Sequence, residues 1–196
     1  MPIMKLCNLA KVQSGHISRG NIEPLIDGSH FLVRARDVDA NSLTYSTNSI
    51  TRFNPNLSQK DWILEKDDIL FMARGARNFS VLLNDILEPA LAAACFFIIR
   101  ASHQICLPPY LWWYLNQTPV EDYLHRESGR GVHMPVVRRA VLENMEIPVP
   151  PLETQQKIVA LDMLMRKEQK LLNKMAEKRK ELTNAVCLKA ALTTRK

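Results

Sequence analysis

The chain has 196 residues, 46% of them hydrophobic and 23% charged, a composition typical of a globular domain with a sizeable core. Its longest apolar run, residues 91–99, is far shorter than the roughly 20 residues of a membrane-spanning helix, and the N-terminus has no secretory signal pattern. These features predict a cytoplasmic protein. Residues 1–149 have 15 Lys and Arg against 15 Asp and Glu, whereas residues 150–196 have 11 against 5. The net charge of +6 therefore lies wholly at the C-terminal end, as a solvated basic face or beside an acidic partner such as a phosphate backbone.

The cysteines and histidines form no recognisable metal-binding or redox pattern. The four cysteines include no C-x-x-C pair, and none of the five histidines lies at a ligand spacing from them, so we expect neither a metal nor a cofactor. Cys95 lies in an apolar run and Cys187 among helix-forming residues. These settings favour buried, inert thiols over redox or catalytic ones.

From residue 1 to about residue 105 the sequence predicts short strands separated by turns. Short apolar runs with strand character are bounded by turn-forming pairs such as Asp27-Gly28 and Asn54-Pro55. The expected strands are residues 31–33, 69–72, 80–83 and 95–99. This part of the chain should be mostly β.

Helices are expected after Leu107-Pro108-Pro109. Proline presets the first turn of a helix, and the residues that follow are apolar at helical spacing. The expected helices are residues 110–116, 119–125 and 136–144.

Three prolines within residues 147–151 mark a boundary, because proline removes backbone donors and pushes the preceding residue into an extended conformation. Residues 153–192 contain no Gly or Pro and are rich in strong helix formers. One continuous helix, about 60 Å long, is expected there. The sequence thus predicts an α+β fold, in which a mostly β domain with small helices over residues 1–150 precedes a long coiled-coil helix over 151–196.

The long helix carries apolar residues at heptad spacing. Seven of ten heptad positions form this apolar stripe: Ile158, Leu161, Met165, Leu172, Met175, Leu182 and Val186. A solitary helix could not expose such a stripe to water. With one such helix in the chain, the stripe must pack on a second copy or on another protein.

No enzyme motif stands out. The six glycines form no G-x-G cluster after a strand, which argues against a SAM-dependent methyltransferase. Residues 107–110 resemble the Pro-Pro-aromatic loop of amino-methyltransferases, but Leu107 cannot hydrogen-bond a target amino group, and a helix start explains them better. The acidic residues 65–68 are better explained as a turn before a strand than as a nuclease metal site. We expect a chain that is not itself an enzyme.

Two loop-like segments carry side chains suited to DNA. Arg74, Arg77 and Asn78 follow a strand and offer the guanidinium and amide groups that read guanine and adenine edges. Arg130 lies between two glycines that would allow close backbone approach. Either segment could instead be a solvated loop. We predict that these four residues face DNA together, with weaker candidates at Arg19 and His133.

These segments, in their order along the chain, resemble the specificity subunit of type I restriction-modification systems. The resemblance covers nearly the whole chain and rests on residues 9–15, 31–38, 64–75, 109–116 and 147–158. Residues 147–158, Ile-Pro-Val-Pro-Pro-Leu-Glu-Thr-Gln-Gln-Lys-Ile, are the most specific, because they are similar to the family's entry into its conserved helix. Asp67 departs from the glycine that is usual in the family's Gly-Asp-Ile-Leu-Phe stretch.

The resemblance implies a non-catalytic subunit that reads double-stranded DNA and directs methyltransferase subunits, and in some systems a restriction subunit, to a split site. In the family, two recognition domains are separated by two long antiparallel helices. A chain with one domain and one helix is similar to half a subunit, which implies a homodimer through the C-terminal helix. The alternative is an assembly adaptor whose helix binds a partner while its domain no longer reads DNA.

Overall fold

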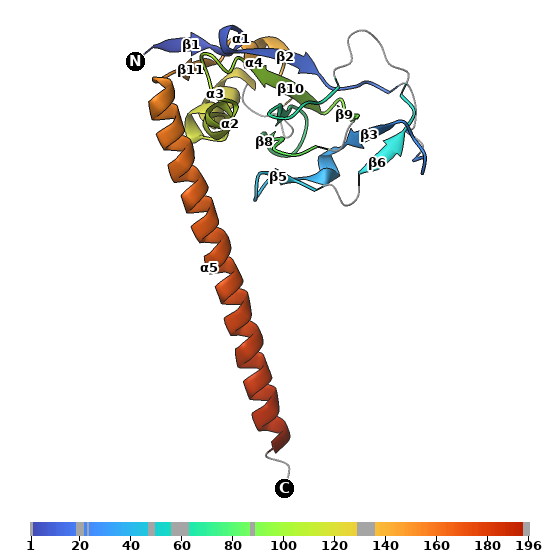
Figure 1. Ribbon diagram of the computed structural model, residues 1–196, viewed down its shortest axis with the longest axis vertical. Coiled ribbons are helices and arrows are strands. Elements are labelled where there is room, and N and C mark those ends of the chain that lie inside the picture. Colours follow the sequence, from blue (N-terminus) through green and yellow to red (C-terminus); the bar gives the residue numbers. More distant parts are fainter. Residues whose placement is uncertain are drawn as a thin grey trace. The chain divides into compact units, whose positions relative to one another are not determined.

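The computed structural model describes residues 2–18, 22, 24–46, 50–55, 63–86, 89–128 and 136–193. The chain divides into two compact units, Met1–Gln156 and Lys157–Lys196. The first unit contains all the strands of the described residues and four short α-helices, and the second consists of the greater part of one long helix (Figure 1). The expected α+β class is confirmed.

A four-stranded antiparallel sheet forms the centre of the first unit. Its strand order is β2-β10-β7-β8, and its strands are β2 (Ala10–Ser14), β10 (Phe96–Ala101), β7 (Ile69–Met72) and β8 (Ser80–Leu82). Strands β7 and β10 are buried on both faces. This burial explains why their sequences are continuous apolar runs without polar alternation.

Three smaller strand groups complete the first unit. In the three-stranded sheet β6-β3-β9, β3 pairs antiparallel with β6 and parallel with β9. Its strands are β6 (Thr51–Phe53), β3 (His30–Val33) and β9 (Ala90–Ala92). Two antiparallel pairs join β1 (Ile3–Lys5) with β11 (Glu146–Pro148) and β4 (Val38–Asp39) with β5 (Thr44–Tyr45). Figure 1 shows β1 and β11 at the end of this unit opposite to β3 and β6.

The main core lies on one face of the central sheet. Alternate residues of β7 and β10, including Leu70, Met72, Phe96 and Ile98, belong to one buried cluster, as the two-residue period of a strand requires. A close backbone approach beside this cluster needs a glycine. A Cβ at Gly15 would stand 2.2 Å from the carbonyl oxygen of Ala93, so any larger residue would push the two segments apart.

Helix α2 (Pro108–Leu115) joins the central sheet to the β1–β11 pair. Trp112 donates from Nε1 to the carbonyl of Ser80 at 3.0 Å, and Asn116 accepts from the Ser80 amide at 2.8 Å. Tyr110 donates its hydroxyl to the carbonyl of Pro148 at 2.7 Å, and burial raises the pKa of this tyrosine to about 12, so it remains a donor at neutral pH. The Pro-Pro-aromatic residues therefore begin a structural helix, as expected.

A buried glutamine holds the first turn of helix α5 (Leu152–Thr193) in the first unit. Gln155 is completely buried. Its Oε1 accepts the amide of Leu107 at 2.9 Å, and its Nε2 donates to the carbonyls of Ile105 and Pro150 at 3.0 and 2.8 Å. Each polar atom of the side chain is satisfied, which removes the cost of burying an amide.

The remaining helices of the described residues are α1 (Leu6–Leu9), α3 (Thr118–Ser128) and α4 (Arg139–Glu143), and Ala35–Asp37 form the 3-10 turn η1. The helix expected over residues 136–144 is therefore shorter than predicted. Val136 instead forms an antiparallel bridge with Arg74, a contact between distant segments that helical periodicity cannot reveal. In the described residues no helix is long and apolar enough to cross a membrane.

The expectation for the cysteines was wrong in one case. Cys187 is exposed on α5, because helix-forming neighbours indicate a helix and not which side of it is covered. Cys95 is half-buried, and burial raises the pKa of its thiol. Cys106 is the buried cysteine, with a thiol pKa raised by burial to about 12.

Replacing Gln155 with Ala should lower the free energy of unfolding by about 2–4 kcal/mol, because the Leu107 amide and two carbonyls would be buried without partners. Urea denaturation of parent and variant measures the difference. The neighbouring Gln156 is exposed, so Gln156→Ala is the matched control and should change stability by less than about 0.5 kcal/mol. Equal stability of the two variants would contradict the assigned role.

Candidate nucleic-acid interface

Arg74 lies where strand β7 ends, on a rigid part of the backbone. The amides of Ala73 and Arg74 both donate to the carbonyl of Cys95, at 2.8 and 3.2 Å, and the carbonyl of Ala73 accepts the amide of Val137 at 3.0 Å. Arg74 also forms the bridge with Val136. Two distant segments therefore fix the backbone from which this arginine projects, so little backbone order has to be gained on binding.

The connection from β7 to β8 presents two arginines and closes on an asparagine. Arg74 and Arg77 are exposed, and in the described part of the chain neither guanidinium has a hydrogen bond or an ion pair. Asn78 is half-buried and donates from Nδ2 to the carbonyl of Met72 at 2.8 Å. The structure thus leaves the two arginines able to reach a ligand, whereas the Asn78 amide is used to hold the loop.

A second basic segment lies beside Arg74. Burial raises the pKa of the half-buried Cys95 thiol. The Ala35 amide and the charge of Arg74 are close enough to this thiol to lower its pKa in part. Turn η1, which starts at Ala35, therefore comes close to the end of β7. It carries Arg34 and Arg36 at its start and centre, two residues that the sequence analysis did not select.

The two arginines of η1 are held differently. Asp37 is buried and accepts the backbone amide of Arg34 at 2.8 Å. Arg36 is exposed and donates to Oγ1 of Thr51 at 2.9 Å. The Arg34 guanidinium has two buried nitrogens, Nε and Nη2, that have no hydrogen-bond partner among the described residues. Because these two nitrogens are buried, they are not open to a DNA phosphate. The exposed Arg36 is therefore the residue of η1 that joins the candidate site, and its Arg-x-Arg-Asp context was the only sequence signal.

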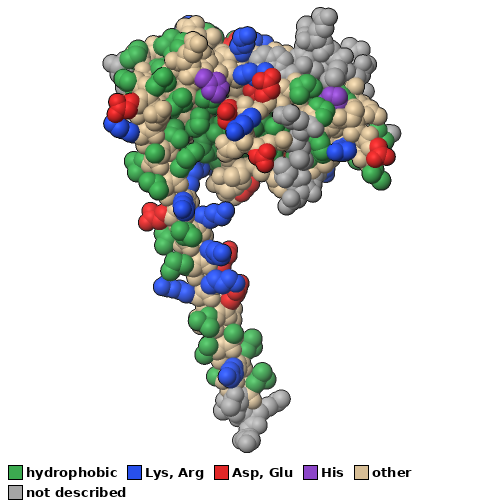
Figure 2. Space-filling view, viewed as in Figure 1, with side chains coloured by type: hydrophobic (Ala, Val, Ile, Leu, Met, Phe, Trp, Pro, Cys, Tyr) green, Lys and Arg blue, Asp and Glu red, His purple; other side chains and the backbone are tan. Residues whose placement is uncertain are grey.

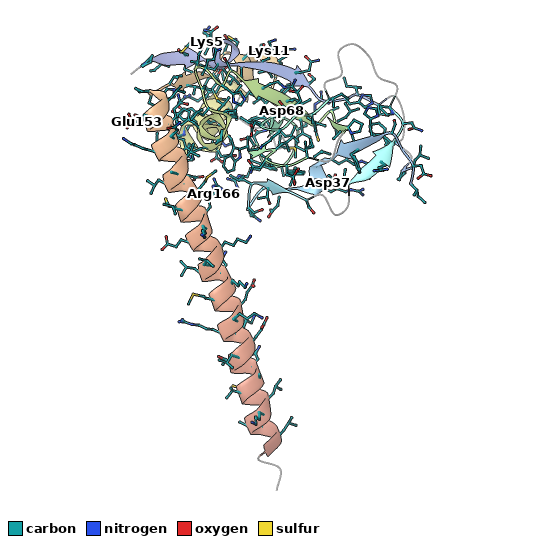
Figure 3. The ribbon with its side chains drawn as sticks, viewed as in Figure 1. Lys5, Lys11, Asp37, Asp68, Glu153 and Arg166 are labelled. Carbon is teal, nitrogen blue, oxygen red and sulfur yellow. The ribbon has the colours of Figure 1, made fainter. Side chains whose placement is uncertain are left out.

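The acidic side chains of the turn before β7 form structural ion pairs with Arg100. Asp68, which is labelled in Figure 3, is buried. Its two carboxylate oxygens accept from Nε and Nη2 of Arg100 at 2.7 and 2.8 Å. Arg100 also donates to Glu65 at 2.7 Å, and Asp67 has the left-handed φ of 70° that tightens the turn. A guanidinium thus occupies the position that a nuclease would give to a cation. Across the described residues, no group of three or more His, Cys, Asp or Glu could hold a metal ion.

Comparisons with known proteins identify the kind of domain that presents these arginines. Residues 33–181 match the family model described as the type I restriction modification DNA specificity domain. The chain belongs to this family. The matched residues include the η1 turn, the β7–β8 connection and most of α5. A separate comparison with curated proteins found no match.

Solved structures share the fold of this specificity domain. The HsdS subunit from Thermoanaerobacter tengcongensis is 20% identical with a TM-score of 0.68, over 92% of this chain and 46% of that one. A chain from a study of complex assembly and conformational transition of the type I R-M system is 18% identical with a TM-score of 0.72, over 97% and 48%. The S subunit from M. genitalium is 11% identical with a TM-score of 0.56, over 94% and 44%. This chain therefore spans about half the length of the solved chains that it matches.

The structure describes three of the six residues that the sequence analysis predicted to contact DNA. Arg74, Arg77 and Asn78 lie together in the β7–β8 connection. Arg19, Arg130 and His133 lie outside the described residues. Val136, the first described residue after them, forms the bridge with Arg74. That the six residues contact DNA stays a prediction.

Replacing Arg74 or Arg77 with Ala should weaken binding to the cognate duplex by about 1–3 kcal/mol each, if the side chain reads a base edge. The free energy of unfolding should not change, because both side chains are exposed and have no partner in the described structure. The cognate duplex is obtained by selection from a randomised pool, and affinity is measured by fluorescence anisotropy.

Arg126, an exposed arginine of α3, supplies the matched control, and Arg126→Ala should bind like the parent. Asn78→Ala should lower stability as well as affinity, because it releases the carbonyl of Met72. If Arg74→Ala and Arg77→Ala bind cognate and random duplexes as the parent does, the β7–β8 connection is not the reading surface.

Proposed function

We propose that this chain reads one half of a split site in double-stranded DNA and directs methyltransferase subunits, and in some systems a restriction subunit, to that site. Residues 1–150 would be the recognition domain, and residues 151–196 the dimerisation and spacer helix. The observation that carries the proposal is the match of residues 33–181 to a DNA specificity domain. This match favours DNA reading over the assembly adaptor that the sequence left as an alternative.

The site chemistry supports recognition without catalysis. Arg74 and Arg77 are exposed on a firmly held backbone, and arginine reads guanine through two donors on one plane. The acidic side chains of the turn before β7 are engaged by Arg100. The chemistry would therefore be supplied by the partner subunits.

The apolar stripe supports association through α5. Leu161, Met165, Leu172, Met175, Leu182 and Val186 are each 52–66% exposed. Burying the seven stripe side chains at about 1.5–3 kcal/mol each would contribute some 10–20 kcal/mol before entropic costs. We propose that a second copy of the chain covers this stripe.

The charges on α5 favour an antiparallel pair. A parallel pair would set Lys174, Arg179 and their basic neighbours beside their own copies. Reversal brings this basic half toward Glu153 and Asp162 of the other copy. Two recognition domains related by a two-fold axis should then prefer a symmetric split site.

The test of DNA reading is binding to selected and random duplexes across a range of salt concentrations. The parent should bind its selected duplex at least about 10³-fold more tightly than random DNA, with an affinity that falls as salt rises. Purified chain with SAM or magnesium should neither methylate nor cleave either duplex. Equal binding to all sequences would favour the adaptor, and a product formed by the chain alone would overturn the non-catalytic role.

Placing Asp at both Leu172 and Met175 should give a folded monomer that no longer recruits its methyltransferase partner, because two carboxylates in the stripe oppose its burial. Light scattering measures the mass, and circular dichroism the helix content. The control introduces the same charge outside the stripe, with Asn173→Asp and Asn184→Asp. A parent chain that is monomeric at micromolar concentration would contradict the homodimer and assign the stripe to a different protein.

A further inference from the structure

A row of lysines lies on α5 away from the apolar stripe. Lys167, Lys170 and Lys174 follow one another at spacings of three and four residues, which places them on one face of the helix. At about 100° per residue, this lysine row is centred roughly 150° around the helix from the apolar stripe. A helix partner seated on the stripe would therefore leave the row accessible.

The three lysines are exposed, and no carboxylate of the described residues pairs with them. In the described part of α5, ion pairs join Arg166 to Asp162 and Lys178 to Glu181, and none involves the lysine row. Figure 2 shows Lys and Arg side chains gathered along the middle of this helix. Like charges three and four residues apart destabilise a helix by about 0.2–0.5 kcal/mol per pair, so the row does not stabilise α5 by itself.

The location of the charge excess indicates what the row binds. Residues 1–149 carry equal numbers of basic and acidic residues, and the whole net charge of +6 lies beyond them. A protein that binds DNA obtains most of its sequence-independent affinity from cations near phosphates. In this chain the surplus cations that could supply it are on the C-terminal segment. Within the described part of α5, the lysine row is a group of these cations that share one face and have no ion pair.

We infer that Lys167, Lys170 and Lys174 contact the DNA phosphate backbone and add affinity that does not depend on sequence. This inference rests on the proposed DNA-reading function. The row extends over about 11 Å of helix, a length of B-DNA along which each strand carries about three phosphates. Flexible lysine side chains act as point charges toward phosphate and read no base edge.

The test compares the parent with a variant in which Lys167, Lys170 and Lys174 are replaced by Gln. Anisotropy titrations with the selected duplex and with random DNA are made from 0.05 to 0.3 M salt, values chosen to span about a sixfold range. Three lost phosphate contacts should flatten the slope of log affinity against log salt by about 2.7 for each chain of the proposed homodimer that contacts the duplex. Both duplexes should be weakened by at least about 10²-fold at 0.1 M. The ratio of the two affinities should stay unchanged.

The matched control removes three positive charges from the same helix outside the row, with Lys157→Gln, Lys180→Gln and Lys189→Gln. If the row makes direct contacts, this control should change the slope much less than the row variant does. Light scattering and urea denaturation establish that both variants keep the mass and stability of the parent.

Three results would overturn the inference. Equal slopes for the row variant and the parent would exclude phosphate contact. Equal effects of the two triple variants would assign the change to net charge instead of to the row. Unchanged DNA binding with lost capture of the methyltransferase subunit would assign the row to an acidic protein surface.

A parent that selects no DNA sequence would overturn the proposed function too, whereas a selective parent with an unaffected row variant would overturn only this inference.

Discussion

The cost of burying polar groups without partners governs how this domain is built. Gln155 is the clearest case, because its amide satisfies one backbone donor and two backbone acceptors while being completely buried. Asn116 does the same for the start of β8, and Tyr110 for the carbonyl of Pro148. These three side chains tie α2, the proline-rich segment and the first turn of α5 to the central sheet.

The residues that carry the family resemblance are therefore mainly structural. The stretch from Pro109 to Asn116 holds strands together through Trp112 and Asn116, and the stretch from residue 147 to 158 contains Gln155. The candidate reading residues Arg74 and Arg77 lie instead in an exposed connection between two buried strands. A buried framework with exposed variable loops allows one fold to present different DNA-reading side chains.

Charge and apolar surface are also divided between separate parts of the chain. Residues 1–149 are neutral overall, although they contain 11 of the chain's 14 arginines. Helix α5 has both the apolar stripe, which we assign to a second copy, and the lysine row, which we assign to phosphates. Selective contacts and sequence-independent attraction would then come from different elements, so either could change without the other.

The sequence by itself determined the local features that depend on neighbouring residues. Apolar runs predicted β7 to the residue and β10 to within two, and the proline boundary followed by uninterrupted helix formers predicted α5 to within one residue at each end. The hydrophilic turn at residues 65–68 and the helix start at Pro108 were predicted for the same reason. Only the tertiary structure decided what distant segments do to one another: that Val136 pairs with Arg74, and that the Ala35 backbone comes close to Cys95 at the end of β7. Those outcomes depend on contacts across many tens of residues, which composition and periodicity do not contain.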